Sequence, residues 1–167
     1  MSRVFENLPI MEQVPVLPTL TFENHLTIYG SERKVELHCF GGGHTASDAF
    51  LYLPQEKIAF MGDIATENLH LPIHNPDDFL TILEKLNEFE IEKVVPGHGE
   101  IGTLEICEIL HDYLLMLVSR AKDAHRNRIS LEDFVSSFEI PTEYKQWRGV
   151  NGIKTNLVNV YTFYLEK

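Results

Sequence analysis

Short runs of alternating hydrophobic and polar residues in the first half of the chain predict β-strands. In residues 34–39, KVELHC, every second residue is apolar, which indicates a strand with one buried face and places His38 on the polar face. Residues 57–61, KIAFM, are almost continuously apolar, which predicts burial on both faces. The turn 54–56 joins this run to the preceding one as an antiparallel hairpin. Strands are predicted at 21–23, 25–29, 34–39, 49–53, 57–61 and 93–95.

Further along the chain the hydrophobic period changes to that of helices. Asn75 is a good N-cap, Pro76 suits the first helical position, and apolar residues follow at helical spacing as far as Phe89. Thr103 is the expected cap of a long helix to about residue 126, and Ser130 caps a shorter helix to about 138. A last helix follows 151–152. The predicted class is α/β (α+β), a mixed, mostly antiparallel sheet with helices on one face.

Length and composition predict a single domain over 1–167. A chain of 167 residues that is 44% hydrophobic can bury a substantial core. Three parts are expected: an extended lead-in over 1–20, a sheet with ligand loops over 21–100, and a mainly helical part over 101–167. The lone Trp147 is predicted to belong to the core.

Charge and cysteine content exclude several classes of protein. A formal net charge of -11 repels phosphate backbones, so no nucleic-acid partner is expected. No apolar run approaches the roughly 20 residues of a membrane span and no signal peptide is recognised, so a cytoplasmic protein without a membrane partner is predicted. Cys39 and Cys107 are far apart and are expected to be small core residues.

Three glycine-bearing turns each follow a hydrophobic run and each carry a candidate metal ligand. They are GGGHTASD at 41–48 with His44, GD at 62–63 with Asp63, and PGHG at 96–99 with His98. Glycine permits the sharp bend, and strands ending on one side of a sheet can aim the three side chains at one point. The sequence therefore predicts a metal site formed by His44, Asp63 and His98.

Other polar residues near these turns leave alternatives open. His70 and His74 follow Asp63 and either complete a rebuilt metal site or belong to a polar loop near a helix start; the loop is favoured. Asp48 either orients a ligand from a second layer of contacts or ends the loop. His25, His38, His111 and His125 are expected to have no chemical role.

Taken together, the three motifs resemble the second half of the metallo-β-lactamase fold superfamily, in the order and at separations typical of that family. The resemblance implies one half of an αββα sandwich and two metal ions, usually zinc, that activate a bridging hydroxide. It also implies that His44 binds the first ion, Asp63 bridges both, and His98 binds the second. The implied activity is hydrolysis of an ester, thioester, lactam or phosphoester in a small-molecule substrate.

The sequence also departs from the family pattern. The HxHxDH motif is absent, and no two histidines are separated by one residue. The chain corresponds to the family domain from its middle onward, so the resemblance implies that the first sheet and its ligands are missing. An apolar sheet face would then be exposed, and we expect it to be covered by a second copy in a twofold dimer or by a separate N-terminal half. Two hypotheses stay open: a metal-dependent hydrolase that is incomplete as this chain alone, or a non-catalytic binding or assembly module.

Overall fold

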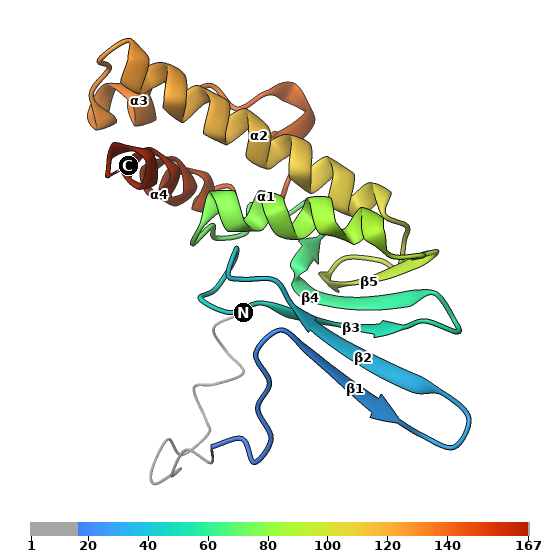
Figure 1. Cartoon of the computed structure of the whole chain (residues 1–167). Helices are drawn as coiled ribbons and strands as arrows, with labels where there is room; N and C mark the ends of the chain where they lie inside the picture. Colours follow the sequence, from blue (N-terminus) through green and yellow to red (C-terminus); the bar gives the residue numbers. More distant parts are fainter. Residues whose placement is uncertain (1–16, 167) are drawn as a thin grey trace, which may run out of the picture.

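The computed structural model describes residues 17–166, which form a five-stranded mixed sheet followed by helices (Figure 1). The strand order is β1-β2-β3-β4-β5; the first four strands are antiparallel neighbours, and β5 runs parallel to β4. The strands are β1 (His25–Tyr29), β2 (Lys34–Cys39), β3 (Ala49–Leu53), β4 (Ile58–Thr66) and β5 (Lys93–His98). The predicted mixed sheet is thereby confirmed.

The predicted strand at 21–23 is wrong. Pairing between β1 and β2 begins where the Cys39 N–H donates to the Asn24 carbonyl at 2.8 Å. Because β2 ends at Cys39, residues 21–23 have no neighbouring strand with which to form a hydrogen-bond ladder. Most of the predicted lead-in, residues 1–16, lies outside the described residues.

Four α-helices and two short 3-10 turns, η1 and η2, follow the hairpins. Asn75 caps the first helix by accepting from the N–H groups of Asp77 and Asp78, and Ser130 caps the third by accepting from Asp133, as predicted. Thr103 lies one residue before the N-cap of the second helix, which is Leu104 and makes no side-chain cap bond. The elements are α1 (Pro76–Lys85), η1 (Leu86–Glu88), α2 (Glu105–Arg126), α3 (Leu131–Ser137), η2 (Thr142–Tyr144) and α4 (Gly152–Leu165).

The helices lie on one face of the sheet, as Figure 1 shows. Sheet residues that point toward them are almost completely buried: Phe50, Tyr52, Ala59, Met61 and Val94. They join one hydrophobic cluster with side chains of α1, α2 and α4. None of the described helices is both long and apolar enough to cross a membrane.

His38 lies on the helix-facing side of β2, contrary to its predicted position on a polar face. Its ring is 5.3 Å from that of Phe50 and 4.8 Å from that of Phe89, and its side chain is only 12% exposed. A period of two separates the two faces of a strand but does not show which face the helices will cover. Here the aromatic rings of β3 and of the segment after η1 pack against His38, so His38 lies on the covered face.

The opposite face of the sheet is apolar across all five strands. Strand register places Leu26, Leu37, Leu51, Phe60 and Val95 in one row. Flanking rows add Ile28, Val35, Cys39, Ala49, Leu53 and Ile58, and Lys93 is the charged residue at the edge. We call these twelve residues the open face. None of them belongs to the described core or to the half-buried hydrophobic residues packed against it.

Phe60 on the open face corrects the expectation that 57–61 is buried on both sides. Its neighbours Ala59 and Met61 are fully buried under the helices, but Phe60 itself is 43% exposed. Within residues 17–166 the sheet has one covering layer, so Phe60 and Gly62 stay exposed in the first part of β4, whereas Ile64, Ala65 and Thr66 are all buried.

His70 lies in the loop before α1, as the favoured alternative held, but its side chain is buried in the core and does not complete a metal site. It is only 2% exposed, and its ring packs against Trp147 and Tyr113. A carbonyl can only accept, so Nε2 donates to the Tyr144 carbonyl at 3.2 Å and Nδ1 accepts from the Tyr113 hydroxyl at 2.9 Å. Burial lowers the pKa of His70 and raises that of Tyr113 to about 12, so both are neutral.

We expect the His70→Gln variant to lose stability less steeply than the wild type between pH 7 and pH 5. Below about 6.5, the ordinary histidine pKa, the unfolded chain binds a proton at position 70 that the folded chain excludes. The contribution of His70 to stability is therefore complete above that pH and is lost as pH falls toward the lower folded pKa. Urea denaturation at a series of pH values measures the difference. His74→Gln, at an exposed histidine of the same loop, is the control and should keep the wild-type profile.

Candidate metal centre

Three side chains from separate parts of the sheet meet at one end of it. The carboxylate of Asp63 lies between two imidazoles: Oδ2 is 3.5 Å from His44 Nε2, and Oδ1 is 3.5 Å from His98 Nε2. His44 comes from the loop between β2 and β3, Asp63 from β4, and His98 from the end of β5. The structure therefore brings together the three residues that the sequence singled out.

A bulge in β4, rather than a turn at its end, presents Asp63. The predicted strand 57–61 was too short, since β4 continues to Thr66 with register shifts on either side of Gly62. Gly62 has a φ of 52°, in the left-handed region that glycine adopts without a Cβ penalty. This single residue redirects the strand locally without breaking it, and Asp63 follows immediately.

Gly97 lets β5 approach the carboxylate closely. A Cβ at position 97 would lie 2.3 Å from Asp63 Oδ1 and 2.6 Å from the Gly62 carbonyl carbon. No other amino acid fits there without displacing Asp63. The next residue, His98, is held by its carbonyl, which accepts from the Glu67 N–H at 2.8 Å.

Asp48 shapes the loop that carries His44. Its carboxylate is buried and accepts from the backbone N–H groups of Gly43 at 2.8 Å, His44 at 2.6 Å and Thr45 at 3.1 Å, and also from the Thr45 hydroxyl. Four donors converging on one carboxylate fix the backbone on both sides of His44. Asp48 therefore positions the candidate ligand besides closing the loop, which combines the two alternatives that the sequence left open.

The tautomer of His44 follows from its second hydrogen bond. Nδ1 lies 2.8 Å from the carbonyl oxygen of Pro72, which can only accept, so Nδ1 carries the proton. In the neutral imidazole Nε2 then has a free lone pair directed toward Asp63. Two electron-rich groups 3.5 Å apart repel one another unless a cation or a proton lies between them.

Helix α4 holds the Pro72 carbonyl in place. Asn156, fully buried, accepts from the Ile73 N–H at 3.1 Å and donates to the Leu71 carbonyl at 2.8 Å. These bonds fix the residues on both sides of Pro72. The roles of Pro72 and Asn156 were not predicted from the sequence, because their contacts span 28 and 83 positions and leave no local pattern.

His74 does not join the candidate site through its side chain. Its backbone N–H donates to the Gly43 carbonyl at 2.8 Å, and its side chain is exposed in a hollow beside α4 lined by Val158, Asn159 and Phe163. The preference for a loop role over a ligand role at this position agrees with that geometry.

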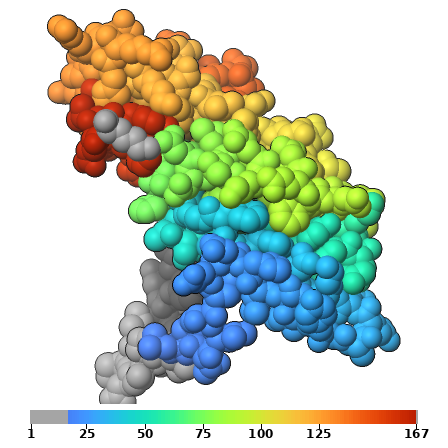
Figure 2. All heavy atoms as spheres, in the orientation of Figure 1, coloured from blue at the N-terminus to red at the C-terminus, as the bar shows by residue number. Residues whose placement is uncertain are grey.

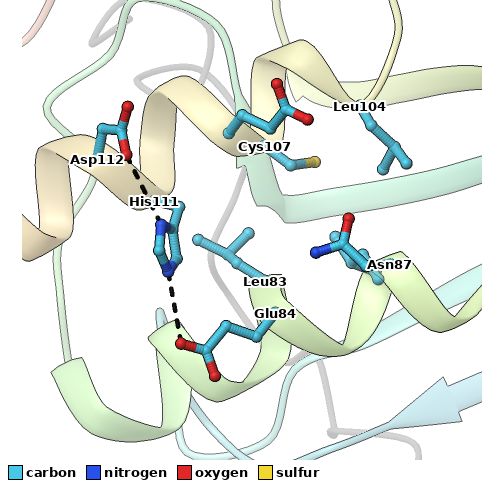
Figure 3. A pocket seen from close by; sticks show the side chains of 9 residues that line it. Leu83, Glu84, Asn87, Leu104, Cys107, His111 and Asp112 are labelled. Atoms are coloured by element: carbon cyan, nitrogen blue, oxygen red, sulfur yellow. Dashed lines mark ion pairs between the residues drawn. The ribbon is translucent and has the colours of Figure 1, made fainter.

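A second hollow lies between α1 and α2, and Figure 3 shows His111 between two carboxylates there. Nε2 of His111 is 3.6 Å from Glu84, and Nδ1 is 3.8 Å from Asp112. Cys107 lines the same hollow, but burial raises the pKa of its thiol to about 12. The thiol is therefore protonated at neutral pH, and Cys107 provides no thiolate nucleophile in this hollow.

Comparison with known proteins identifies the family. The family model described as the metallo-beta-lactamase superfamily matches residues 2–98, more than half of the chain, and the chain therefore belongs to this superfamily. A metallo-beta-lactamase type 2 of Bacteroides fragilis is 30% identical over 99 residues, which are 55% of this chain and 40% of that protein. A beta-lactamase-like protein 2 homolog of Caenorhabditis elegans is 26% identical over 81 residues, 48% of this chain and 27% of that protein.

Solved structures agree on the fold. The inverting sec-alkylsulfatase Pisa1 of Pseudomonas sp. superimposes with a TM-score of 0.73 at 18% identity over 90% of this chain and 27% of that one. A metallo-beta-lactamase from Pontibacter korlensis gives a TM-score of 0.53 at 24% identity, covering 59% of this chain and 49% of that one. The chain spans less than half the length of each of these four proteins.

We expect the Asp48→Asn variant to lose about 1–3 kcal/mol of unfolding free energy. An amide has one accepting oxygen and turns its NH₂ group toward N–H donors of the loop, so buried donors lose their partner. Urea denaturation measures the loss. Ser47→Ala, an exposed change in the same loop, should stay within about 0.5 kcal/mol of the wild type. Equal stability of the two variants would contradict the role given to Asp48.

Proposed function

We propose that this protein is a metal-dependent hydrolase of the metallo-beta-lactamase type, in which His44, Asp63 and His98 bind zinc. The observation that carries the proposal is the tautomer of His44. Its Nδ1 is engaged by Pro72, and its Nε2 lone pair faces a carboxylate oxygen. A divalent cation between these atoms converts a repulsive contact into two ligand bonds.

The types of ligand fit zinc. Imidazole nitrogen and carboxylate oxygen both bind this borderline cation, and Asp63 turns one oxygen toward each histidine. Asp63 would hold zinc together with His44 through one oxygen and together with His98 through the other. Half-exposed side chains of Asp63 and His98 leave the site open to a substrate.

When bound, zinc supplies a nucleophile by lowering the pKa of water toward about 7 and polarises the bond to be cleaved. The chain's own residues hold the ligands in place: Pro72 fixes the ring of His44, Asp48 fixes its backbone, and Gly97 admits the carboxylate of Asp63. The substrate classes are hydrolysable small molecules, namely lactams, esters, thioesters and phosphoesters. The likeness to an alkylsulfatase adds sulfate esters.

Three ligands leave a dinuclear site incomplete, and we propose that a second copy of the chain packs on the open face. The face is apolar over its full width and has no acidic side chain, so two copies of net charge -11 can meet there without local repulsion. A twofold arrangement matches one apolar sheet to an identical one. A separate N-terminal half of the domain is the competing occupant.

The first test is the zinc content of the purified full chain, measured by atomic emission after dialysis. We expect His44→Ala and Asp63→Ala to retain less zinc per chain than the wild type and to lose hydrolysis of lactam, sulfate-ester and thioester substrates. His74→Ala removes an exposed histidine near the loop and should retain both. A wild type and a His44→Ala variant with the same zinc content would exclude the proposed site.

The second test is the mass in solution by light scattering. We expect a dimer for the wild type and a monomer for Phe60→Asp, because a buried unpaired charge disrupts an apolar interface. Leu115→Asp on α2 is the matched control, since Leu115 and Phe60 are equally exposed at 43% and Leu115 lies away from the open face. A monomeric wild type would remove self-association and leave the separate N-terminal half as occupant.

The open face also favours a second candidate function. A protein that binds no metal but associates through this face would be a binding or assembly module that retains the fold. Two results together would support that function instead: a wild type that associates but has no zinc and no hydrolysis, and a Phe60→Asp variant that no longer associates.

A further inference from the structure

A second group of metal-ligating side chains lies on β1 and β2, the strands at the far edge of the sheet from β5. His25 and His38 are directly opposite one another in the β1–β2 register, and Glu36 is two residues before His38 on the same face. Each of the three offers a ligand atom, and these atoms lie within 4.8 Å of one another. Directly opposite residues and i, i+2 neighbours are adjacent on one face, so strand register alone brings the group together.

Glu36 is oriented by Lys34 and is hydrogen-bonded to His38. Oε1 accepts from the ammonium group of Lys34 at 2.7 Å, while Oε2 lies 3.2 Å from His38 Nε2. Lys34 therefore fixes the carboxylate through one oxygen and leaves the other beside the imidazole. A carboxylate that is already oriented loses less freedom when it binds an ion.

His38 is fixed by an aromatic surround. The rings of Phe40, Phe50 and Phe89 lie 4.8–5.8 Å from its own. This packing holds the ring in one orientation, so little freedom is lost when it binds an ion.

His25 is the adjustable ligand. It is exposed at the start of the edge strand, and the Thr27 hydroxyl lies 3.1 Å from its Nε2. Its ring stacks on that of His38 with centroids 4.6 Å apart and 26° between the planes. Convergence of both nitrogens on one ion requires a rotation of the His25 side chain, and its exposure permits that rotation.

We propose that His25, Glu36 and His38 form a separate zinc site with two imidazole ligands, one carboxylate and a fourth position open to solvent. This ligand set favours zinc over magnesium or calcium, which prefer all-oxygen coordination. The site is independent of Asp63 and His98, which come from β4 and β5 at the other side of the sheet.

Metal at this site joins the edge strand to the rest of the sheet. Among the described strands β1 pairs only with β2, and Figure 2 shows the β1–β2 region at the far end of the molecule from α3 and α4. Cross-linking His25 of β1 to two residues of β2 opposes separation of the strands. An ion that binds only the closed pair reduces the open population by the factor 1 + [Zn²⁺]/Kd.

The test uses the full chain carrying Asp63→Ala, so that the candidate centre at the other side of the sheet is disabled. Zinc is titrated against a chromophoric chelator, and amide hydrogen exchange of β1 is followed in parallel. We expect one zinc per chain and exchange in β1 slowed by about 100-fold at a zinc concentration of 100 times Kd. Adding His25→Ala should weaken binding at least about 100-fold, since losing even an outer hydrogen-bond partner of a ligand costs about 10- to 100-fold.

Two further variants keep the result interpretable. Glu36→Gln removes the anionic oxygen and should also weaken binding, whereas Glu32→Gln removes one exposed charge from the adjacent turn and should not. His25 and Glu36 are used because replacing the packed His38 risks unfolding. Zinc binding that persists in His25→Ala, or that is already absent in Asp63→Ala alone, would overturn the proposal.

Discussion

The close approach of β4 and β5 around one carboxylate is the constraint on which the candidate metal centre depends. Asp63 reaches His98 only because position 97 has no side chain and position 62 adopts a left-handed backbone. Parallel pairing between β4 and β5 then places the ends of both strands at the same edge of the sheet. A metal site assembled in this way is made by the backbone, and its three side chains have little freedom to find another arrangement.

Support for the site extends into the helical layer. Asn156 on α4 holds the residues that flank Pro72, the carbonyl of Pro72 fixes the proton of His44 on Nδ1, and Nε2 is thereby directed at Asp63. The C-terminal helix therefore also influences a residue in the loop between β2 and β3. The backbone at 71–73 connects α4 to the candidate metal centre.

The partial match to the metallo-beta-lactamase superfamily is relevant to the uncovered apolar face of the sheet. The match to the family model ends at His98. The relatives are more than twice as long as the region they share with this chain. In residues 17–166 the helices cover one side of the sheet, while the other presents an apolar row from Leu26 to Val95. Burial of that apolar row is the physical reason for proposing a partner at this face.

The sequence by itself determined most of the elements and the candidate ligands, but not the absence of a strand at 21–23 or the full length of β4. Period-two alternation, helix caps at Asn75 and Ser130, and glycine next to His44, Asp63 and His98 are local signals, and each depends on residues a few positions apart. Only the tertiary structure decided which side of the sheet the helices cover, and hence that His38 is enclosed and Phe60 exposed. It also decided that His70 enters the core and that Pro72 orients His44. These outcomes depend on contacts between residues that are distant in sequence. A local sequence pattern does not specify which distant residue a side chain will contact.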